Sequence, residues 1–408
     1  MYDQILVALD GSQSSRYAGE MALALATATG GHVIACHVYG VDIHRRRFTD
    51  MEPGLPERYQ EQERLNGLRA AHDRLMREGF LALSAGYVED FVASARQAGI
   101  TIGSVATEGR SYTGILQIAR KRRCDLICLG ADGLGAIGNG MLGGTTTRVI
   151  HGAPCDVLVA RRSPGDGPVL SGVDGSTAAL NAVGTAVDLG RKMERPVRLV
   201  AAYDPDFHTH VFSAVGESLS PERQEQVGLA GQEALHDDII NDGLGKLYSE
   251  FLRDAEHGID SNGVTVTTSL VTGKAYDALN RQAADCDADL IVVSRHGNHR
   301  EPGSRLGSNA EGLLRTTSAN VLLIGGITEE LSEPKAASRV EEIAQPTGSL
   351  TWDSDAESRL QRVPSFVRSM AKRAVENSVR ELGRKRVSVD DFDTVAAQFG
   401  MGRREADA

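Results

Sequence analysis

The stretch that decides the fold reads DLICLGADGLGAIGNGMLGGTTTRVIHGAPCDVLV and runs from Asp125 to Val159. Apolar runs at 126–129 and 157–159 each predict a buried strand. Between them lies a glycine-rich loop, followed by a run of threonines that begins at Thr145 and predicts a helix start. Glycine lets the backbone approach a ligand closely, and the free amides and dipole of a helix N-terminus attract an anion. The stretch therefore predicts a phosphate site.

The surrounding sequence occurs twice. An apolar run leads into Asp10-Gly11-Ser12, and a second one leads into Asp174-Gly175-Ser176, 164 residues later. The same spacing separates five further pairs of glycines and tyrosines: Gly133 and Gly297, Gly143 and Gly307, Gly109 and Gly273, Tyr39 and Tyr203, and Tyr112 and Tyr276. A fixed period of this length indicates a duplicated domain.

Strand-like and helix-like segments alternate within each copy. In the first copy we predict strands at 5–9, 32–39, 100–106, 126–129 and 157–160, with helices at 18–28, before Gly99 and at 112–121. A polar segment, 40–65, leads into the long helix that ends near Gly99. Such alternation predicts a parallel sheet covered by helices, and ligands bind beyond the carboxyl ends of such strands. Asp10 and Gly130 each follow a strand, so we expect them to border one crevice.

The glycine spacing Gly130-x2-Gly133-x9-Gly143 resembles the nucleotide loop of the universal stress protein family, and the likeness covers about four-fifths of the chain in two copies. It implies an α/β fold with two tandem Rossmann-like domains of five parallel strands, at 1–163 and 166–327. It also implies that the two domains pair through their last strands as a pseudo-dimer. The implied ligand is an adenine nucleotide, ATP or otherwise ADP or AMP.

The resemblance assigns nucleotide contacts to particular residues. In the first half these are Ala8, Leu9, Asp10, Val38, Leu129, Gly130, Gly133, Gly143, Gly144 and Thr145. In the second half they are Val173, Asp174, Ala202, Ser294, Gly297, Gly307, Ser308 and Asn309. Carboxylates accept hydrogen bonds from base or ribose, while amides and hydroxyls receive phosphate oxygens.

Each half departs from the family pattern. Gly144 stands where the family has Ser or Thr, and Ser294 replaces the first loop glycine in the second half, where Ser308 restores the hydroxyl. One, both or neither half can therefore bind nucleotide. In the alternative interpretation the glycines only permit tight packing, and the chain is a nucleotide-free scaffold or binds another small molecule or a metal.

An Asp-x-His motif follows the second strand of both halves, at Asp42-x-His44 and Asp206-x-His208. Loops usually diverge, so its recurrence suggests a role. The hypothesis is a zinc site that includes His208 and His299. The alternatives are a polar contact between the halves and a histidine on a solvated loop.

The C-terminal part differs in character from the two copies. Residues 328–350 are rich in Glu, Ser, Pro and Ala and predict a linker, and 351–402 predict a small helical domain. This domain resembles the C-terminal helical domain of the light-independent protochlorophyllide reductase subunit at Trp352, in the run 363–368 and at Gly383. No iron–sulfur cysteine set accompanies it. We therefore expect a module for a protein partner or a homodimer, without reductase activity.

Composition narrows the function further. The net charge of -11 disfavours nucleic acid, and no apolar run is long enough to span a membrane. The five cysteines follow no disulfide or zinc spacing, which predicts reduced thiols in the cytoplasm. The turn at Asp10 lacks the glycines of a dinucleotide-binding fold. The sequence assigns no set of catalytic residues, so we expect at most slow ATP hydrolysis. The sequence predicts a regulator that responds to an adenine nucleotide.

Overall fold

The computed structural model describes residues 1–59, 61–134, 141–229, 231, 243–298, 303–326, 340–342, 350–363 and 365–398. The chain divides into two compact units, which are described separately. Unit 1 comprises Met1–Gly40 and Phe91–Val340, and unit 2 comprises Val41–Asp90 and Glu341–Ala408. Within the described part of the chain, no helix combines the length and apolar character needed to cross a membrane.

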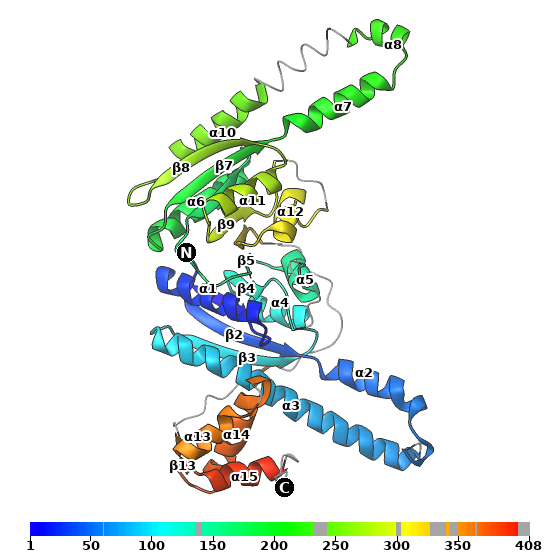
Figure 1. Cartoon of the computed structure of the whole chain (residues 1–408), viewed down its shortest axis with the longest axis vertical. Coiled ribbons are helices and arrows are strands. Elements are labelled where there is room, and N and C mark those ends of the chain that lie inside the picture. Colours follow the sequence, from blue (N-terminus) through cyan, green and yellow to red (C-terminus); the bar gives the residue numbers. More distant parts are fainter. Residues whose placement is uncertain are drawn as a thin grey trace, which may run out of the picture. The chain divides into compact units, whose positions relative to one another are not determined.

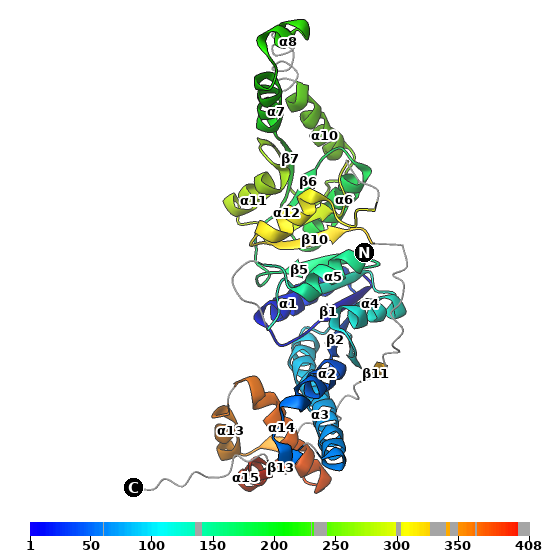
Figure 2. The same cartoon turned by 90° about the vertical axis from the view of Figure 1, so that its right-hand side faces the viewer.

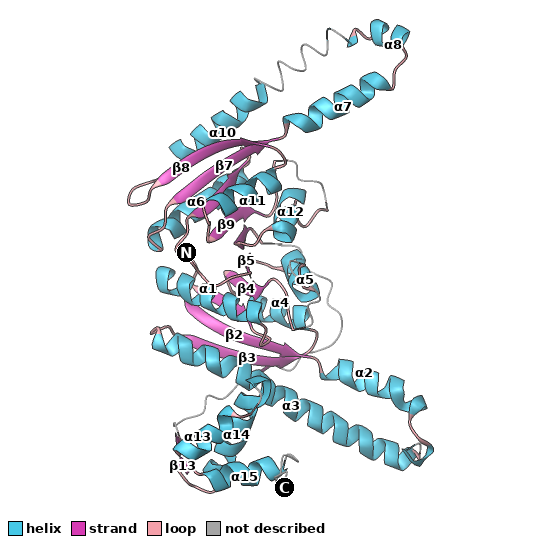
Figure 3. Cartoon of the chain, viewed as in Figure 1, coloured by secondary structure: helices cyan, strands magenta, loops and turns pink. Residues whose placement is uncertain are grey.

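Unit 1 is built on one large sheet (Figures 1 and 3). Its first half contributes β1 (Gln4–Ala8), β2 (His32–Tyr39), β3 (Ile102–Glu108), β4 (Leu126–Gly130) and β5 (Asp156–Ala160). The second half contributes β6 (Val169–Val173), β7 (Val197–Tyr203), β8 (Val266–Thr272), β9 (Leu290–Ser294) and β10 (Asn320–Ile324). Among these ten strands the order is β3-β2-β1-β4-β5-β10-β9-β6-β7-β8, and a further strand, β11 (Val340–Glu342), spans the boundary between the two units. The two halves therefore repeat one Rossmann-like order, and the predicted fold class is confirmed.

The halves meet where β5 and β10 pair. All other neighbouring strands of the two halves are parallel, whereas β5 and β10 are antiparallel, with Leu158 opposite Leu322. Both leucines are fully buried. The last strands thus pair as the resemblance implied, and a single hydrophobic core continues from one half into the other.

Helices cover both faces of the sheet (Figure 2). They are α1 (Gln13–Thr29), α4 (Ser111–Arg122), α5 (Gly144–Gly152), α6 (Thr177–Lys192), α11 (Ala275–Asp285) and α12 (Ser308–Thr316). The core that joins the halves lies under α4, α5, α11 and α12, whereas α1 and α6 contact each other. Ser12 caps α1 by accepting a hydrogen bond from the Ser15 amide, and Ser176 caps α6 in the same way. These caps start both helices directly after the Asp-Gly turns.

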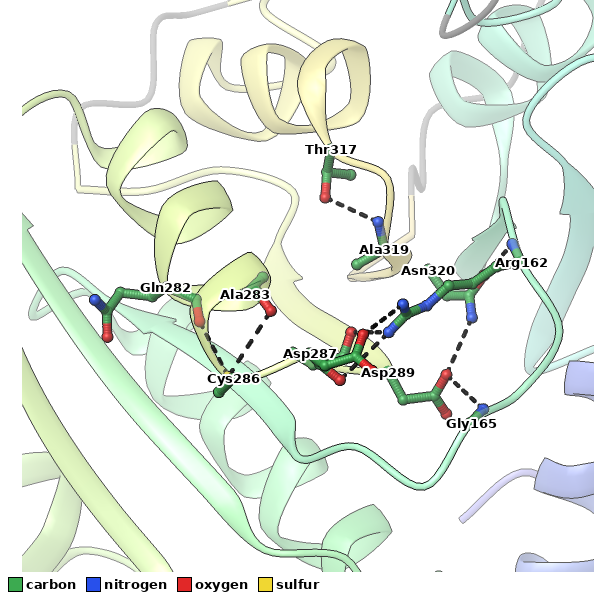
Figure 4. A network of polar contacts seen from close by, with 11 residues as sticks. Arg162, Gly165, Gln282, Ala283, Cys286, Asp287, Asp289, Thr317, Ala319 and Asn320 are labelled. Atoms are coloured by element: carbon green, nitrogen blue, oxygen red, sulfur yellow. Dashed lines mark hydrogen bonds and ion pairs between the residues drawn. The ribbon is translucent and has the colours of Figure 1, made fainter.

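A buried polar network fixes the segment that joins the halves (Figure 4). Asn320 Oδ1 accepts hydrogen bonds from the backbone amides of Arg161 and Arg162, at 2.9 and 3.2 Å. Asp289 Oδ1 accepts one from the Gly165 amide at 2.8 Å. Asn320 and Asp289 are almost completely buried, and burial raises the pKa of Asp289. The joining segment is therefore held in place by side chains of the second half.

Helices also follow β7, where the sequence suggested a loop. They are α7 (Pro205–Glu217), α8 (Pro221–Gln226) and α10 (Gly245–His257), and α7 and α8 extend beyond the end of the sheet in Figure 1. Of these, α10 contacts β6, β7 and β8. The second Asp-x-His motif thus begins a helix, and the prediction of a loop there was wrong.

The N-terminal part of unit 2 is a pair of helices, α2 (Val41–Met51) and α3 (Gln62–Gln97), joined by the short turns η1 (Glu52–Gly54) and η2 (Glu57–Tyr59). Arg45 Nε lies 2.8 Å from a carboxylate oxygen of Asp73, and the Phe48 and His72 rings stack 4.7 Å apart. The first Asp-x-His motif therefore lies in α2, and the prediction of a loop there was wrong.

The C-terminal part of unit 2 has its own small core. Its elements are β12 (Thr351–Trp352), α13 (Ser354–Gln361), α14 (Ser365–Glu381), β13 (Arg386–Val387) and α15 (Val389–Gln398). Ala356, Leu360, Val375, Val379 and Phe392 pack together inside it. A capping box starts α15, because Asp391 Oδ2 accepts a hydrogen bond from the Ser388 amide at 3.0 Å. A short parallel pair, β12–β13, accompanies these helices.

Candidate functional site

A cavity of about 690 Å³ lies at the carboxyl ends of β1 and β4. Every residue predicted for the first half lines it: Ala8, Leu9, Asp10, Val38, Leu129, Gly130, Gly133, Gly143, Gly144 and Thr145. The lining also includes Ser15, His37, Ser111 and Asp132. The residues predicted from the sequence therefore lie around one cavity, because parallel strands bring their ends to one edge of the sheet.

Backbone hydrogen bonds shape the wall of this cavity. The Gly143 amide donates to the Ala131 carbonyl at 2.7 Å, which returns the loop to the end of β4. Thr146 Oγ1 donates to the Gly130 carbonyl at 2.8 Å and ties the first turn of α5 to the same strand. Gly143 is the N-cap residue of α5. The N-terminal turn of a helix thus borders the cavity, as an anion site requires.

Two loop glycines are needed for different reasons. A Cβ atom at Gly130 would lie 2.5 Å from Ser14 Oγ and 2.6 Å from the Ser14 carbonyl carbon, so this glycine permits α1 to pack. A Cβ atom at Gly133 would lie 2.8 Å from Asp10 Oδ2. Gly130 is therefore explained by packing alone, as the alternative interpretation had it, whereas Gly133 makes room for a carboxylate of the cavity.

The carboxylate of Asp10 is held at the end of β1. Its Oδ1 accepts a hydrogen bond from the Ser12 amide at 2.9 Å. The Asp10 amide donates to Ser15 Oγ at 3.4 Å. The turn that starts α1 thus orients a carboxylate toward the cavity, where it can accept hydrogen bonds from a ligand.

His37 is a cavity residue that sequence reasoning missed. Burial lowers its pKa to about 4, although the negative charge of Asp10 acts in the opposite direction. The imidazole is therefore neutral near pH 7. Its only sequence signal is a polar residue within the apolar run of β2, and the position 164 residues later is Ala201.

The second half has a smaller cavity, of about 230 Å³. The residues predicted for this half line it as well: Val173, Asp174, Ala202, Ser294, Gly297, Gly307, Ser308 and Asn309. Arg295 and Tyr248 complete the wall at two points. The two halves therefore place matching residues around spaces of very different size.

An aromatic cluster borders the second cavity through Tyr248 of α10. The Tyr248 ring lies 5.3 Å from Phe251 and 5.9 Å from Tyr203. Burial and the charge of Asp174 raise the pKa of Tyr248. Phe251 packs against Gly175, where a Cβ atom would lie 2.5 Å from the ring. Sequence reasoning missed this cluster because α10 is remote from the glycine loop along the chain.

The carboxylate of Asp174 is already engaged within the protein. Its Oδ1 accepts from the Ser176 amide and its Oδ2 from the Asn298 amide, both at 3.0 Å. Among the described contacts of Asp10 there is no corresponding hydrogen bond from a loop amide. The first-half carboxylate is thus the better placed of the two to receive a ligand.

The zinc hypothesis finds no support in the described residues. His299 and the side chain of His208 lie outside them, and among the described residues no three His, Cys, Asp or Glu side chains gather as a metal site would require. The His44 ring lies 5.0 Å from the Phe80 ring. The described histidine of the Asp-x-His motifs therefore has an aromatic packing partner.

All five cysteines carry free thiols. Burial raises the pKa of Cys124 to about 11 and raises those of Cys36 and Cys128 as well. A thiol that stays protonated is a poor nucleophile. These cysteines therefore serve as packing residues.

The fold and the cavities define a class: a tandem Rossmann-like α/β protein with a glycine loop at a strand end in each half. The model of the universal stress protein family matches residues 1–161 and 167–325. The chain belongs to the universal stress protein family. The model of the proto-chlorophyllide reductase 57 kD subunit matches residues 352–395, in the C-terminal helical region.

Individual relatives agree with this assignment. A universal stress protein of Thermus aquaticus is 30% identical over 161 residues, which are 40% of this chain and 100% of the relative. One of Mycobacterium tuberculosis is 26% identical over 206 residues, and the match spans 49% of this chain and 61% of the relative.

Solved structures are similar at lower identity. A universal stress protein of Archaeoglobus fulgidus has a TM-score of 0.48 and 15% identity over 80% of this chain and 98% of its own. Another universal stress protein, solved in complex with cAMP, has a TM-score of 0.26 and 22% identity over 39% of this chain and 98% of its own.

Proposed function

We propose that this protein is a regulator that binds one adenine nucleotide, ATP in preference, in the first-half cavity. The observation that carries the proposal is the cavity of about 690 Å³ that brings together all ten predicted residues. Small-molecule pockets usually measure about 300–1,000 Å³, so this space is of a suitable size. The Asp10 carboxylate would accept hydrogen bonds from base or ribose, and the first turn of α5 would receive phosphate.

The second half is proposed as a structural partner without nucleotide. Its cavity of about 230 Å³ falls below the usual range for a ligand of this size. Tyr248 borders that space, and the loop amide of Asn298 already occupies a carboxylate oxygen of Asp174. The scaffold interpretation is thus favoured for this half.

Isothermal titration calorimetry of the full chain with ATP tests both statements, and native mass spectrometry of the freshly purified protein gives an independent count. We expect one nucleotide per chain. An Asp10→Ala variant should lose binding, whereas Asp174→Ala, the matched change in the second half, should keep it. If no adenine nucleotide binds, or if two bind with similar affinity, the proposal is wrong.

The proposed role of the protein is regulation through ligand binding. Its proposed location is the cytoplasm, where free thiols such as those of this chain are usual. Nucleotide would alter how the C-terminal helical region meets a protein partner or a second copy. That region has its own core, as a recognition module needs. Hydrogen exchange of residues 350–398 with and without ATP tests this coupling, and unchanged protection would refute it. Phosphate release measured over hours should show at most slow hydrolysis.

A further inference from the structure

The first-half cavity lacks positive charge of its own. Its described lining carries the carboxylates of Asp10 and Asp132 and no lysine or arginine. A polyphosphate brings several negative charges and is repelled by these carboxylates. A site that holds such a ligand therefore needs cations close to the lining.

Arg148 supplies one of them from α5. Side chains on a helix lean toward its N-terminus, and Arg148 NH1 reaches the Gly144 carbonyl at 3.2 Å. Its guanidinium lies over the Tyr112 ring, 5.5 Å from the centroid. Gly144 and the neighbouring Thr145 both line the cavity. The guanidinium thus stands beside the helix turn that is proposed to receive phosphate.

Gly144 leaves space for the guanidinium of Arg148. A Cβ atom at Gly144 would lie 3.2 Å from Arg148 NH1, which is closer than most such contacts. The glycine that replaces the family's hydroxyl residue therefore leaves room for the arginine. The absence of a hydroxyl at Gly144 therefore goes together with the presence of the Arg148 guanidinium.

Arg110 provides a second cation from another element. It is the N-cap residue of α4 and directly precedes Ser111, which lines the cavity. The pKa of Tyr112 is lowered by its contacts with Thr113 and Arg110 and by the charge of Arg148. Tyr112, whose neighbour Ser111 lines the cavity, therefore interacts with both arginines.

The second half shows the opposite combination. At the spacing of 164 residues, Gly144 corresponds to Ser308 and Arg148 corresponds to Gly312. A Cβ atom at Gly312 would lie 2.7 Å from the Tyr276 ring, which covers this position. That half has the hydroxyl and lacks a counterpart of Arg148, so an arginine at this position of the helix accompanies the larger cavity alone.

We propose that Arg148 and Arg110 form a phosphate clamp at the mouth of the first-half cavity, so that the site selects nucleotides with a charged polyphosphate over the nucleoside. The inference rests on the proposed nucleotide binding and names the residues that determine its charge specificity. Guanidinium groups bind phosphate oxygens through charge-assisted, often bidentate, hydrogen bonds.

Calorimetry of the full chain with ATP, ADP, AMP and adenosine, each with excess Mg²⁺, tests the clamp. We expect Arg148→Ala to weaken ATP binding about tenfold, which is ~1.4 kcal/mol, and adenosine binding less than twofold. Arg148→Lys should recover only part of the loss, because lysine is a point charge. Higher salt should weaken ATP binding more in the parent than in Arg148→Ala.

Two controls remove the same charge elsewhere. Lys274→Ala changes the counterpart of Arg110 in the second half, and Lys121→Ala changes the other end of α4. Neither should alter the ATP affinity. Equal ATP affinity of the parent and Arg148→Ala overturns the clamp, and so does an equal loss for ATP and adenosine, which would indicate a structural role. If the parent binds neither ATP nor adenosine, the proposed function itself fails.

Discussion

The stability of unit 1 should depend on pH through His37. Burial lowers the pKa of its imidazole to about 4 in the folded protein, whereas an unfolded chain has a histidine pKa of about 6.5. Below pH 6.5 the unfolded chain therefore binds a proton that the folded chain excludes. Stability should fall as the pH drops from about 6.5 to about 4, and this contribution should level off below that range.

The size of the effect follows from the two pKa values. Linkage gives a loss of ~2 kcal/mol between pH 7 and pH 5, within a maximum of ~3 kcal/mol. A His37→Gln variant keeps a polar side chain of similar size but cannot titrate, so it should lose this part of the pH dependence. From pH 7 to pH 5, the free energy of unfolding of the variant should therefore rise by ~2 kcal/mol relative to that of the parent, because only the parent loses this contribution.

Guanidinium denaturation followed by circular dichroism at a series of pH values measures this difference. His32→Gln is the matched control, because it removes an exposed imidazole from the same strand. The control should keep the parent's pH dependence. If the curves of the parent and His37→Gln run parallel from pH 7 to pH 5, His37 is not buried as a neutral imidazole and the reasoning is refuted.

Three further changes have defined outcomes. Gly133→Ala places a methyl group 2.8 Å from Asp10 Oδ2, and calorimetry should show about tenfold weaker ATP binding, while Gly184→Ala, which meets open space, should have no effect. Tyr248→Ser removes the ring that borders the second cavity, and it should allow a second ATP per chain in native mass spectra; a count that stays at one contradicts this. Asp289→Ala leaves the Gly165 amide without its acceptor, and chemical denaturation should show a loss of ~1–3 kcal/mol, whereas unchanged stability would mean that the network in Figure 4 is unimportant.

Regular and repeated features of the fold could be predicted from the sequence. The segment 32–39 was predicted as a strand and is β2 over that range, because its apolar run is bounded by glycines. The spacing of 164 residues predicted two copies with one topology, and the strand order shows them. Asp10 and Gly130 were expected at one crevice, and both line the first cavity. These features depend on local pattern and on the geometry of parallel sheets.

Other features depend on contacts that are distant in sequence. The sequence suggested a loop at the Asp-x-His motif of α2, whereas the structure has a helix that contacts α3, for example through Arg45 and Asp73. The narrow second cavity depends on Tyr248, which is remote in sequence from Asp174 and carries no local motif. Strands of two residues, such as Thr351–Trp352, are too short to show periodicity. Tertiary context therefore decides the size of each cavity, while the motif decides only its position.

The position of α5 gives the paired halves a physical reason to act together. Its first residues, Gly144 and Thr145, line the first cavity, and Arg295, which lines the second cavity, donates a hydrogen bond to the Ile150 carbonyl near its other end. Arg295 is 3% exposed, and its Nε also donates to the Gly325 carbonyl at 2.7 Å. A phosphate at the start of α5 that moved this nine-residue helix would strain hydrogen bonds of a buried guanidinium, and such bonds are costly to leave unmade. The second half therefore restrains the helix at whose start the ligand is proposed to bind, and a half with a small cavity would contribute to a response in this way.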